Sequence, residues 1–462
     1  MPTKRACRPL GILACVLTFL TLGGCAAPRA YLGEPLSRAT ADGGYRGLRI
    51  VPSRQNDEVL FIVSLSGGGM RASAMAYGLF EQLSADRVGS GATSSRLLDK
   101  VDVISAVSGG AVPAAYFTLY GDRLFRDFES RFLDKDFTAS VRRGILLDPR
   151  NWLRMASSEF FRGDLYAEYF DRRLFHGATF SNLSQSGDRP FLIINATDVG
   201  LASRFEFTQD SFDLICTDLT RYPIARAIAA STLIPALLTP ITIENRAGQC
   251  GYALPDWVSR TLETGDHSSR EYFRASVLKS RSDASRFGYL HLVDGALSDN
   301  LGSRALYDAL ADGSSWMKWT EPPRSPGRRK LIYVSVNAGD WKSTQVSINR
   351  HPPDALQMLR LMGTVPVDRY SAESRILLND ALKEHASREQ AELYHIEIEL
   401  ESLRSDPKLT RLVELPTSFT LARGDALALR CATRRILLAS PDYQRLMRDL
   451  SGTVGPLTTC GE

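Results

Sequence analysis

The sequence lacks the ligand patterns of a metalloprotein. It contains six histidines, and it has no His-x-x-x-His pair, no Cys-x-x-Cys pair and no acidic cluster within a loop. Zinc and calcium sites in proteins are built from such patterns. We therefore expect no metal, and the chemistry that the sequence indicates requires no cofactor.

A strong excess of charge is also missing. The chain has 56 basic and 52 acidic residues, a net charge of +4. Lys4, Arg5 and Arg8 lie in the first 24 residues, which contain no acidic residue, so about one positive charge remains beyond them. Nucleic-acid-binding proteins concentrate positive charge on one face. Bulk charge therefore gives no reason to expect a nucleic acid as partner.

The apolar run at the N-terminus is too short for a membrane-spanning helix. It covers residues 10–22, follows the basic residues and ends in Leu22-Gly23-Gly24-Cys25, which resembles a bacterial lipobox. The pattern predicts a lipoprotein signal peptide over residues 1–24 and lipidation of Cys25; an ordinary secretion signal is the alternative. Ala26 is typical of an outer-membrane address. We expect a lipid-anchored protein of the bacterial cell envelope, on the outer membrane facing the periplasm.

Cysteine is scarce beyond the signal. Cys216, Cys250, Cys431 and Cys460 remain, an even number that permits two disulfides in an oxidising compartment. Of the three possible connectivities we predict the one local in sequence, Cys216–Cys250 and Cys431–Cys460. Four buried thiols are the alternative.

Long Gly/Ser linkers and internal repeats are absent too. Residues 25–56 are rich in Gly, Pro, Arg and Ser without periodicity, which predicts a flexible tether. We expect a catalytic domain over residues 57–340 and a C-terminal α/β extension over residues 341–462 that packs on it. Residues 250–288 are polar and indicate an irregular surface insertion.

A glycine-rich segment follows the first predicted buried strand, residues 59–65. It reads Ser66-Gly67-Gly68-Gly69-Met70-Arg71, and a helix of small residues continues from it. A glycine loop between a strand and a helix can direct several N–H groups at an anion. The spacing also fits a dinucleotide fingerprint, but no acidic residue closes the next strand, and no Gly-Lys-Ser/Thr completes a phosphate loop. An oxyanion hole fits better.

The next strand ends at a serine. Residues 101–107 form a largely apolar run with the β-branched residues Val101, Val103 and Ile104. Ser108 stands in Ala106-x-Ser108-x-Gly110 before a predicted helix over residues 111–120. A strand that passes through Ser into a small-residue turn and a helix is the layout of a nucleophile elbow. Small neighbours are needed because side chains there would block the turn or the substrate. Small-Ser-small turns without catalytic function are the alternative.

An aspartate closes a later predicted strand. Residues 289–293 precede Asp294-Gly295-Ala296, which places a carboxylate where a catalytic base can lie; an Asp that caps the following turn is the alternative. The nearest histidine is His291. Residues three apart on a strand point to opposite faces, so we expect His291 to face away from Asp294. A Ser–Asp dyad is therefore the better account, provided that neighbours raise the basicity of the carboxylate.

Aromatic and arginine side chains interleave over residues 121–175. Such a segment can lie against anionic phospholipid. The interpretation that we favour is a helical cap whose aromatic rings face the core.

Taken in order, the glycine loop, the Ser elbow and the Asp-Gly turn resemble the patatin-like phospholipase family. The resemblance covers roughly residues 59–336, and residues 415–419 resemble the end of bacterial members. It implies an α/β fold of three layers, with a mostly parallel central sheet and helices on both faces. Two positions depart from the family: Ser66 stands where Asp is usual, and Ala106 stands where Gly is usual.

The resemblance also implies roles for individual residues. Ser108 becomes the nucleophile and Asp294 its partner, while Gly67, Gly68 and Gly69 form the oxyanion loop. Arg71 is the basic residue of that loop: it could hold a substrate phosphate, fix the loop through backbone carbonyls, or be a solvated surface residue.

These features predict a membrane-anchored serine acyl hydrolase of the phospholipase A or lysophospholipase type, whose substrate is membrane phospholipid or another acyl lipid. One alternative is a catalytically silent envelope lipoprotein that binds lipid or other proteins. Another is an esterase or thioesterase for soluble substrates.

Overall fold

The computed structural model describes residues 31–460 except 52–57, 90, 92–93, 158–159, 186–188, 234–237, 312–314, 320–328, 340–343 and 349. The predicted signal peptide over residues 1–24 and the predicted lipidation site Cys25 lie outside the described residues.

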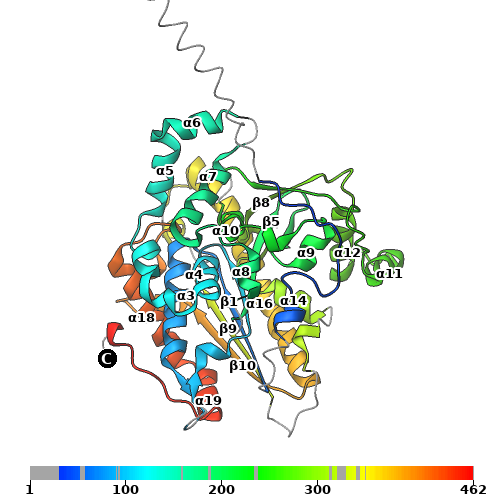
Figure 1. The fold of residues 1–462 in the computed structure, drawn as a ribbon. Coiled ribbons are helices and arrows are strands. Elements are labelled where there is room, and N and C mark those ends of the chain that lie inside the picture. Colours follow the sequence, from blue (N-terminus) through cyan, green and yellow to red (C-terminus); the bar gives the residue numbers. More distant parts are fainter. Residues whose placement is uncertain are drawn as a thin grey trace, which may run out of the picture.

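A mostly parallel sheet of eight strands forms the centre of the molecule (Figure 1). Its order is β10-β9-β1-β4-β5-β8-β7, and β6 pairs with β5. The pairs from β10 to β5 are parallel, whereas β8 runs antiparallel to β5 and β7 antiparallel to β8. The strands are β1 (Val59–Leu65), β4 (Val103–Val107), β5 (Phe191–Asp198), β6 (Ser203–Glu206), β7 (Ile241–Glu244), β8 (Tyr289–Asp294), β9 (Lys330–Asn337) and β10 (Glu392–Glu399).

The near-continuous apolar strands are buried on both faces, as parallel strands covered by helices must be. Every residue of β4 and β5 is buried, and so are six of the seven residues of β1. The strand predicted over residues 59–65 is confirmed with the same bounds.

Helices cover the two faces of the sheet in the way that the strand order dictates. From β1 to β4 to β5 the chain moves toward one edge, and from β9 to β10 it moves toward the other. Because such crossovers are right-handed, α3 (Gly69–Ala85) and α4 (Ser108–Tyr120) share one face, while α16 (Ala355–Arg388) lies on the opposite face. Helix α18 (Arg423–Ala439) packs on α3, and α14 (Arg304–Ala311) packs on α16.

The remaining helices surround this frame (Figure 1). The segment between α4 and β5 is helical and contains a π-helix (Leu124–Leu133), α5 (Phe137–Leu147), α6 (Pro149–Met155), α7 (Arg162–Phe170), a second π-helix (Asp171–Phe175) and α8 (Phe180–Gln185). Elsewhere lie α2 (Gly47–Ile50), α9 (Gln209–Leu214), α10 (Ile224–Thr232), α11 (Asp256–Thr264), α12 (Arg270–Arg281), α13 (Ala296–Asp299), α15 (Thr344–Ile348), α17 (Thr410–Val413) and α19 (Pro441–Asp449). A small antiparallel pair joins β2 (Arg87–Val88) to β3 (Ser95–Arg96).

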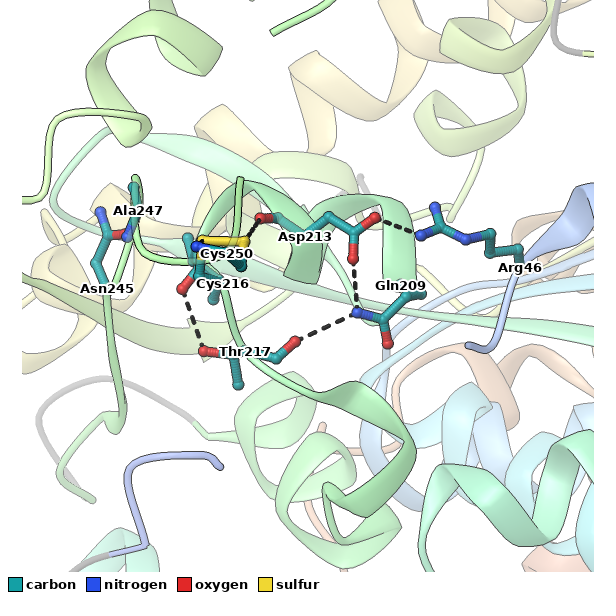
Figure 2. Close-up of a disulfide and its surroundings, with 9 residues drawn as sticks. Arg46, Gln209, Asp213, Cys216, Thr217, Asn245, Ala247 and Cys250 are labelled. Carbon is teal, nitrogen blue, oxygen red and sulfur yellow. Dashed lines mark hydrogen bonds and ion pairs between the residues drawn. A yellow bond between two sulfur atoms is a disulfide. The ribbon is translucent and has the colours of Figure 1, made fainter. Parts of the chain in front are cut away.

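The N-terminal segment over residues 31–51 packs on the domain, which corrects the prediction of a flexible tether for these residues. Tyr45 is 1% exposed, and its hydroxyl accepts a hydrogen bond from the Leu192 N–H on β5 at 2.7 Å. Arg46 is paired with Asp210 of α9 and with Asp213 of the same helix; Figure 2 shows the pair with Asp213. The segment is rich in Gly and Pro, and this composition does not reveal that a few large side chains attach it to the core.

The two disulfides predicted from sequence are both formed. Cys216 pairs with Cys250, with a Cα–Cα distance of 5.4 Å, and Cys431 pairs with Cys460. The first lies beside Asp213, so it joins the segment after β7 to the region that holds Arg46 (Figure 2). The second connects α18 to the C-terminal residues.

One further expectation needs correction, and the C-terminal residues contribute more than packing. Residues 250–288 are not irregular, because α11 and α12 form there and pack against each other. The predicted C-terminal extension supplies β10, which pairs along its whole length with β9 of the predicted catalytic domain. Residues 341–462 therefore complete the central sheet as well as packing on it.

Candidate active site

Ser108 lies at the sharp turn between β4 and α4. Its φ angle is +49°, a conformation that non-glycine residues seldom adopt. The chain approaches closely on both sides: a Cβ on Gly109 would lie 1.9 Å from the Gly69 carbonyl oxygen, and one on Gly110 would lie 2.6 Å from the Ser66 carbonyl oxygen. Ala106 is fully buried within β4, so its methyl group is accommodated inside the sheet. These observations agree with the predicted elbow.

A second serine holds the elbow in place. The backbone N–H of Ser108 donates to Ser231 Oγ at 2.8 Å, and this hydroxyl donates in turn to the Asn195 carbonyl at 2.6 Å. All three residues are buried. Ser231, at the end of α10, therefore satisfies two buried backbone groups that would otherwise cost about 1–3 kcal/mol each.

The sheet register brings Asp294 to Ser108. Val107 pairs with Asn195 of β5 on one side, and Asp294 pairs with the next residue of β5, Ala196, on the other. Ser108 and Asp294 are therefore at the same level with one strand between them, and β8 delivers Asp294 because it runs antiparallel. The Ser108 hydroxyl donates to Asp294 Oδ2 at 2.8 Å.

The Asp294 carboxylate is poised between ionised and protonated near neutral pH. Burial of the carboxyl group in its surroundings raises its pKa to about 6. Hydrogen bonds from the Ala296 N–H to Oδ1, at 2.9 Å, and from Ser108 to Oδ2 act in the opposite direction. Its basicity is thus greater than that of a free Asp, which is the condition that a Ser–Asp pair requires.

The structure leaves the histidines away from this pair. His291 is exposed, and its Nδ1 lies 3.0 Å from Thr242 Oγ1 on β7. Within the described residues, the hydrogen bonds of Ser108 and of the Asp294 carboxylate include no histidine. The position of His291 agrees with the expectation that it faces away from Asp294.

The glycine loop approaches Ser108 closely. A Cβ on Gly67 would lie 3.3 Å from the Ser108 Cβ and 2.6 Å from Asn300 Oδ1. Gly68 and Gly69 have φ angles of +135° and +60°, which glycine adopts readily. The conformation of the loop therefore requires glycine, because side chains at these positions would clash with the neighbouring backbone or strain the chain.

The backbone N–H groups of the three glycines differ in their hydrogen-bond partners. Gly67 N–H donates to the Asn300 carbonyl at 2.9 Å and is therefore already paired. For the N–H groups of Gly68 and Gly69, the described part of the chain provides no hydrogen-bond partner. These two groups stand at the start of α3, where helical N–H groups are unsatisfied. Gly68 and Gly69 are thus the candidate donors.

Ser66 fixes the beginning of the loop. Its hydroxyl accepts a hydrogen bond from the Ala338 N–H at 2.9 Å and donates to the Gly67 carbonyl at 2.8 Å. An aspartate at this position could accept the same N–H, so a serine satisfies the acceptor requirement without adding a charge.

Arg71 holds the C-terminal segment over residues 413–420, which packs on the glycine loop. Its guanidinium donates to the Val413 carbonyl at 3.0 Å, the Leu415 carbonyl at 2.6 Å and Thr417 Oγ1 at 3.0 Å. Arg71 is 5% exposed, so the interpretation as a solvated surface residue is wrong. The contacts are those expected of an arginine that fixes the loop through backbone carbonyls.

The same segment touches the loop directly. Met70 N–H donates to the Ser418 carbonyl at 2.7 Å, and a Cβ on Gly69 would lie 2.5 Å from that oxygen. Sequence reasoning missed Ser231, Asn300 and Ser418 as supporting residues. Ser231 stands in the small-residue helix α10, but nothing local in the sequence identifies which backbone group its hydroxyl binds.

The described residues contain no group of three or more His, Cys, Asp or Glu side chains that could hold a metal ion. None of their helices combines the length and the apolar character that crossing a membrane requires.

Comparison with known proteins gave three results. No curated protein matches the chain. A structure of human GIVD cytosolic phospholipase A2 aligns with a TM-score of 0.47 and 14% identity, over 93% of this chain and 69% of that one. A second structure of the human enzyme, in complex with methyl gamma-linolenyl fluorophosphonate, aligns with a TM-score of 0.32 and 14% identity over 73% and 63% of the two chains.

The third result is a family model. The model described as patatin-like phospholipase matches residues 63–307, more than half of the chain. The match includes the glycine loop, the Ser108 elbow and the Asp294 turn, and it ends before β9. The chain belongs to the patatin-like phospholipase family.

Proposed function

We propose that the protein hydrolyses carboxylic esters of membrane phospholipids or related acyl lipids, with Ser108 as nucleophile and Asp294 as general base. The observation that carries the proposal is the 2.8 Å hydrogen bond from the Ser108 hydroxyl to Asp294 Oδ2, formed at a strained turn. Membership of the family supports a lipid acyl hydrolase at the level of reaction class.

In the first half-reaction, Ser108 Oγ attacks the carbonyl carbon of the ester while its proton passes to Asp294 Oδ2. The resulting tetrahedral intermediate carries its negative charge on the former carbonyl oxygen. The intermediate collapses with loss of the alcohol, which leaves with the proton held by Asp294. The product of this half is an acyl-enzyme on Ser108.

In the second half-reaction a water molecule takes the place of the alcohol. Asp294 accepts a proton from the water as it attacks the acyl carbon, and Ser108 Oγ leaves with that proton. The fatty acid is released and the pair returns to its starting state. A carboxyl pKa of about 6 allows Asp294 both to accept and to return the proton near neutral pH.

The N–H groups of Gly68 and Gly69 are the proposed oxyanion donors. They belong to a loop that lies against Ser108, and they begin α3, whose dipole favours negative charge at this end. Loss of one such donor in a serine hydrolase costs about 10²–10³-fold in kcat. Arg71 then acts as a positioning residue, because its contacts hold the segment that packs on the loop.

We also propose that the protein is a lipoprotein anchored through Cys25 on the periplasmic side of the bacterial outer membrane. The lipobox-like sequence before Cys25 and the two disulfides support this location, because disulfides persist in oxidising compartments. Mass spectrometry of the mature N-terminus should find a diacylated Cys25, and Cys25→Ser should abolish the modification. An unmodified N-terminus at another residue would refute the anchor.

The activity is tested with a serine-directed probe and with substrates in two physical states. An alkyl fluorophosphonate should label the protein on the peptide that contains Ser108, and Ser108→Ala should abolish the label. Turnover should be higher on micellar or vesicular phospholipid than on a monomeric p-nitrophenyl ester. Labelling with turnover of the monomeric ester alone would indicate a soluble-substrate esterase, and absence of both would indicate a silent lipoprotein.

A further inference from the structure

Helices α5 and α6 form a hairpin whose outer side is apolar and exposed. Leu146 and Leu147 at the end of α5 are 57% and 71% exposed, and Trp152 and Leu153 on α6 are 52% and 78% exposed. We call these four residues the hairpin tip. In Figure 1 the hairpin projects from one end of the molecule. Four large apolar side chains gathered at a projection are unusual for a surface that faces only water.

The hairpin is a folded element with a buried side of its own. Phe137 and Val141 of α5 are buried in the core. The Trp152 indole N–H donates to the Ile145 carbonyl at 2.9 Å, and Asn151 Nδ2 donates to the Gly144 carbonyl at 2.9 Å. Because the indole N–H is already satisfied, the Trp152 ring can enter an apolar phase without leaving a donor unpaired.

Arginines surround the hairpin tip. Arg142, Arg143 and Arg150 are exposed, and within the described residues no carboxylate lies at ion-pair distance from them. By contrast, Arg154 pairs with Glu168. Residues 136–157 contain four arginines and two acidic residues, Asp136 and Asp148, which cap α5 and α6. A hydrogen bond from Thr420, together with the nearby charges of Arg143 and Arg142, lowers the pKa of Asp136. The surface therefore combines apolar side chains with an excess of positive charge.

The hairpin is attached at the catalytic end of the sheet. Phe137, the first residue of α5, donates its N–H to the Phe419 carbonyl at 3.1 Å, and the two rings are 6.0 Å apart. The neighbouring Ser418 carbonyl binds the Met70 N–H at the glycine loop. The segment over residues 418–419 therefore contacts both the hairpin and the loop that carries the proposed oxyanion donors.

A second exposed apolar stripe lies toward the same end. Helix α16 connects the end of β9 to the start of β10, so its N-terminal half lies at the end of the sheet that holds Ser108. Its 34 residues span about 50 Å, against about 26 Å for the eight residues of β9. Met358, Met362 and Val365, spaced to share one helix face, are 46%, 70% and 58% exposed.

We propose that the hairpin tip is the surface through which the protein docks on bilayers that contain anionic phospholipid. The inference rests on the proposed function, because it names the surface that presents the active site to a lipid substrate. Leucine and tryptophan side chains enter the boundary between head groups and acyl chains, while arginines bind the lipid phosphates. Docking at the hairpin turns the glycine loop and Ser108 toward the membrane.

A membrane fits this surface better than a second copy of the chain does. In a symmetric dimer the same patch appears on both subunits, which would bring Arg142, Arg143 and Arg150 of each copy close to those of the other. Like charges opposed in this way cost several kcal/mol. An anionic bilayer instead neutralises all three arginines at once.

The test measures vesicle binding without catalysis. The protein is prepared as the mature chain with Cys25→Ser, so that no lipid is attached, and with Ser108→Ala so that the vesicles stay intact. It is sedimented with sucrose-loaded vesicles of phosphatidylethanolamine and phosphatidylglycerol, and with vesicles of phosphatidylcholine alone. Binding should be stronger to the anionic vesicles and should weaken as salt is raised.

Two variants and two matched controls identify the surface. Leu147→Glu/Leu153→Glu should lower the partition coefficient at least tenfold, and Arg142→Gln/Arg143→Gln/Arg150→Gln should lower it about 10²-fold on anionic vesicles. Phe273→Glu/Val454→Glu is the control for the first variant, because Phe273 and Val454 are 59% and 43% exposed and the change in net charge is the same. Arg260→Gln/Lys279→Gln/Arg286→Gln is the control for the second, because these three residues are exposed and their loss changes the net charge equally.

The outcomes separate the docking surface from the proposed function. Variants that bind as tightly as their controls overturn the inference, even if the unmutated enzyme hydrolyses phospholipid. Binding that depends on the hairpin supports it, even if the protein with Ser108 intact hydrolyses no ester. A dimer that dissociates in Leu147→Glu/Leu153→Glu, detected by sedimentation velocity without lipid, would show that the tip is a self-interface and would also overturn the inference.

Discussion

The elbow at Ser108 and the glycine loop meet in one site but are held by different parts of the chain. The elbow is supported by Ser231, Asn195 and Asp294, all within the region that the family model matches. The glycine loop is held at Gly67 by Asn300, but its helical end is supported by the segment over residues 413–420, and Arg71 reaches Val413 across 342 positions of sequence. This segment lies beyond the matched region.

The difference separates two parts of the proposed mechanism. The nucleophile and its base need only adjacent strands of the sheet, so their geometry follows from strand register. The proposed oxyanion donors stand at a helix start whose position depends on a distant segment. We therefore expect damage to the elbow to abolish the chemistry, and damage to the C-terminal segment to weaken stabilisation of the transition state.

Removal of the nucleophile should have the largest effect. Ser108→Ala should lower kcat/KM by roughly 10⁴-fold or more, and Asp294→Asn by a comparable factor, because neither group transfers the proton alone. The double variant should be no slower than either single variant. Steady-state turnover of a p-nitrophenyl ester measures all three, with circular dichroism to verify folding. Near-normal turnover in one single variant would end the assignment of the pair.

Detachment of the C-terminal segment should have the next largest effect. Arg71→Met removes the hydrogen bonds to Val413, Leu415 and Thr417, and we expect kcat to fall about 10²-fold, the scale of one lost oxyanion donor. The loss should be equal on phospholipid and on a neutral ester, with KM and the pH profile little changed. Arg71→Lys, which keeps the charge but not the fork of donors, should recover part of the rate.

A larger loss on phospholipid than on the neutral ester would instead assign Arg71 to the substrate phosphate. Activity on the two substrates thus distinguishes two roles of Arg71: positioning the glycine loop or binding the lipid.

The elbow could be predicted from sequence because its signals are local. A strand, a small-residue turn and a helix occupy adjacent positions around Ser108, and the Asp-Gly turn at Asp294 is equally compact. The antiparallel direction of β8 was not predicted, although the encounter of the two side chains depends on it. The disulfides also followed a local rule, since each closes a short stretch of sequence.

What the sequence could not show depends on contacts between distant residues. The N-terminal segment resembles a tether in composition, yet Tyr45 and Arg46 attach it to the core. The segment between α4 and α7 has both predicted characters at once: Phe128, Phe132 and Phe137 are buried, while Trp152 is exposed. Alternation of aromatic and basic residues cannot tell which rings a fold will bury, because that depends on the packing partner.

The acid limb of the pH profile sharpens the role of Asp294. The carboxylate must be ionised to accept the serine proton, so kcat/KM should fall about tenfold per pH unit below the pKa of about 6. Acid unfolding caused by protonation of Asp294 does not explain such a loss of activity. Because its folded pKa is raised above the value of a free Asp, its protonation favours the folded state as pH falls from about 6 toward the unfolded value.

A rate measured against pH from 4.5 to 8, with folding followed by circular dichroism, tests this expectation. A flat profile between pH 7 and pH 5 would show that the reaction does not depend on ionised Asp294.

The smallest effects should come from two supporting side chains that do not touch substrate: Ser231 behind the elbow and Thr417 behind the glycine loop. Ser231→Ala leaves the buried Ser108 N–H and Asn195 carbonyl without their partner, and should lower the free energy of unfolding by about 1–3 kcal/mol for each of the two groups. Thr417→Val keeps the side-chain volume and leaves Arg71 two carbonyl acceptors, so we expect about 1 kcal/mol or less. Urea unfolding of both variants at pH 8 measures the difference. A greater loss in Thr417→Val would mean that the distant segment, rather than the elbow, is the more tightly coupled support of the site.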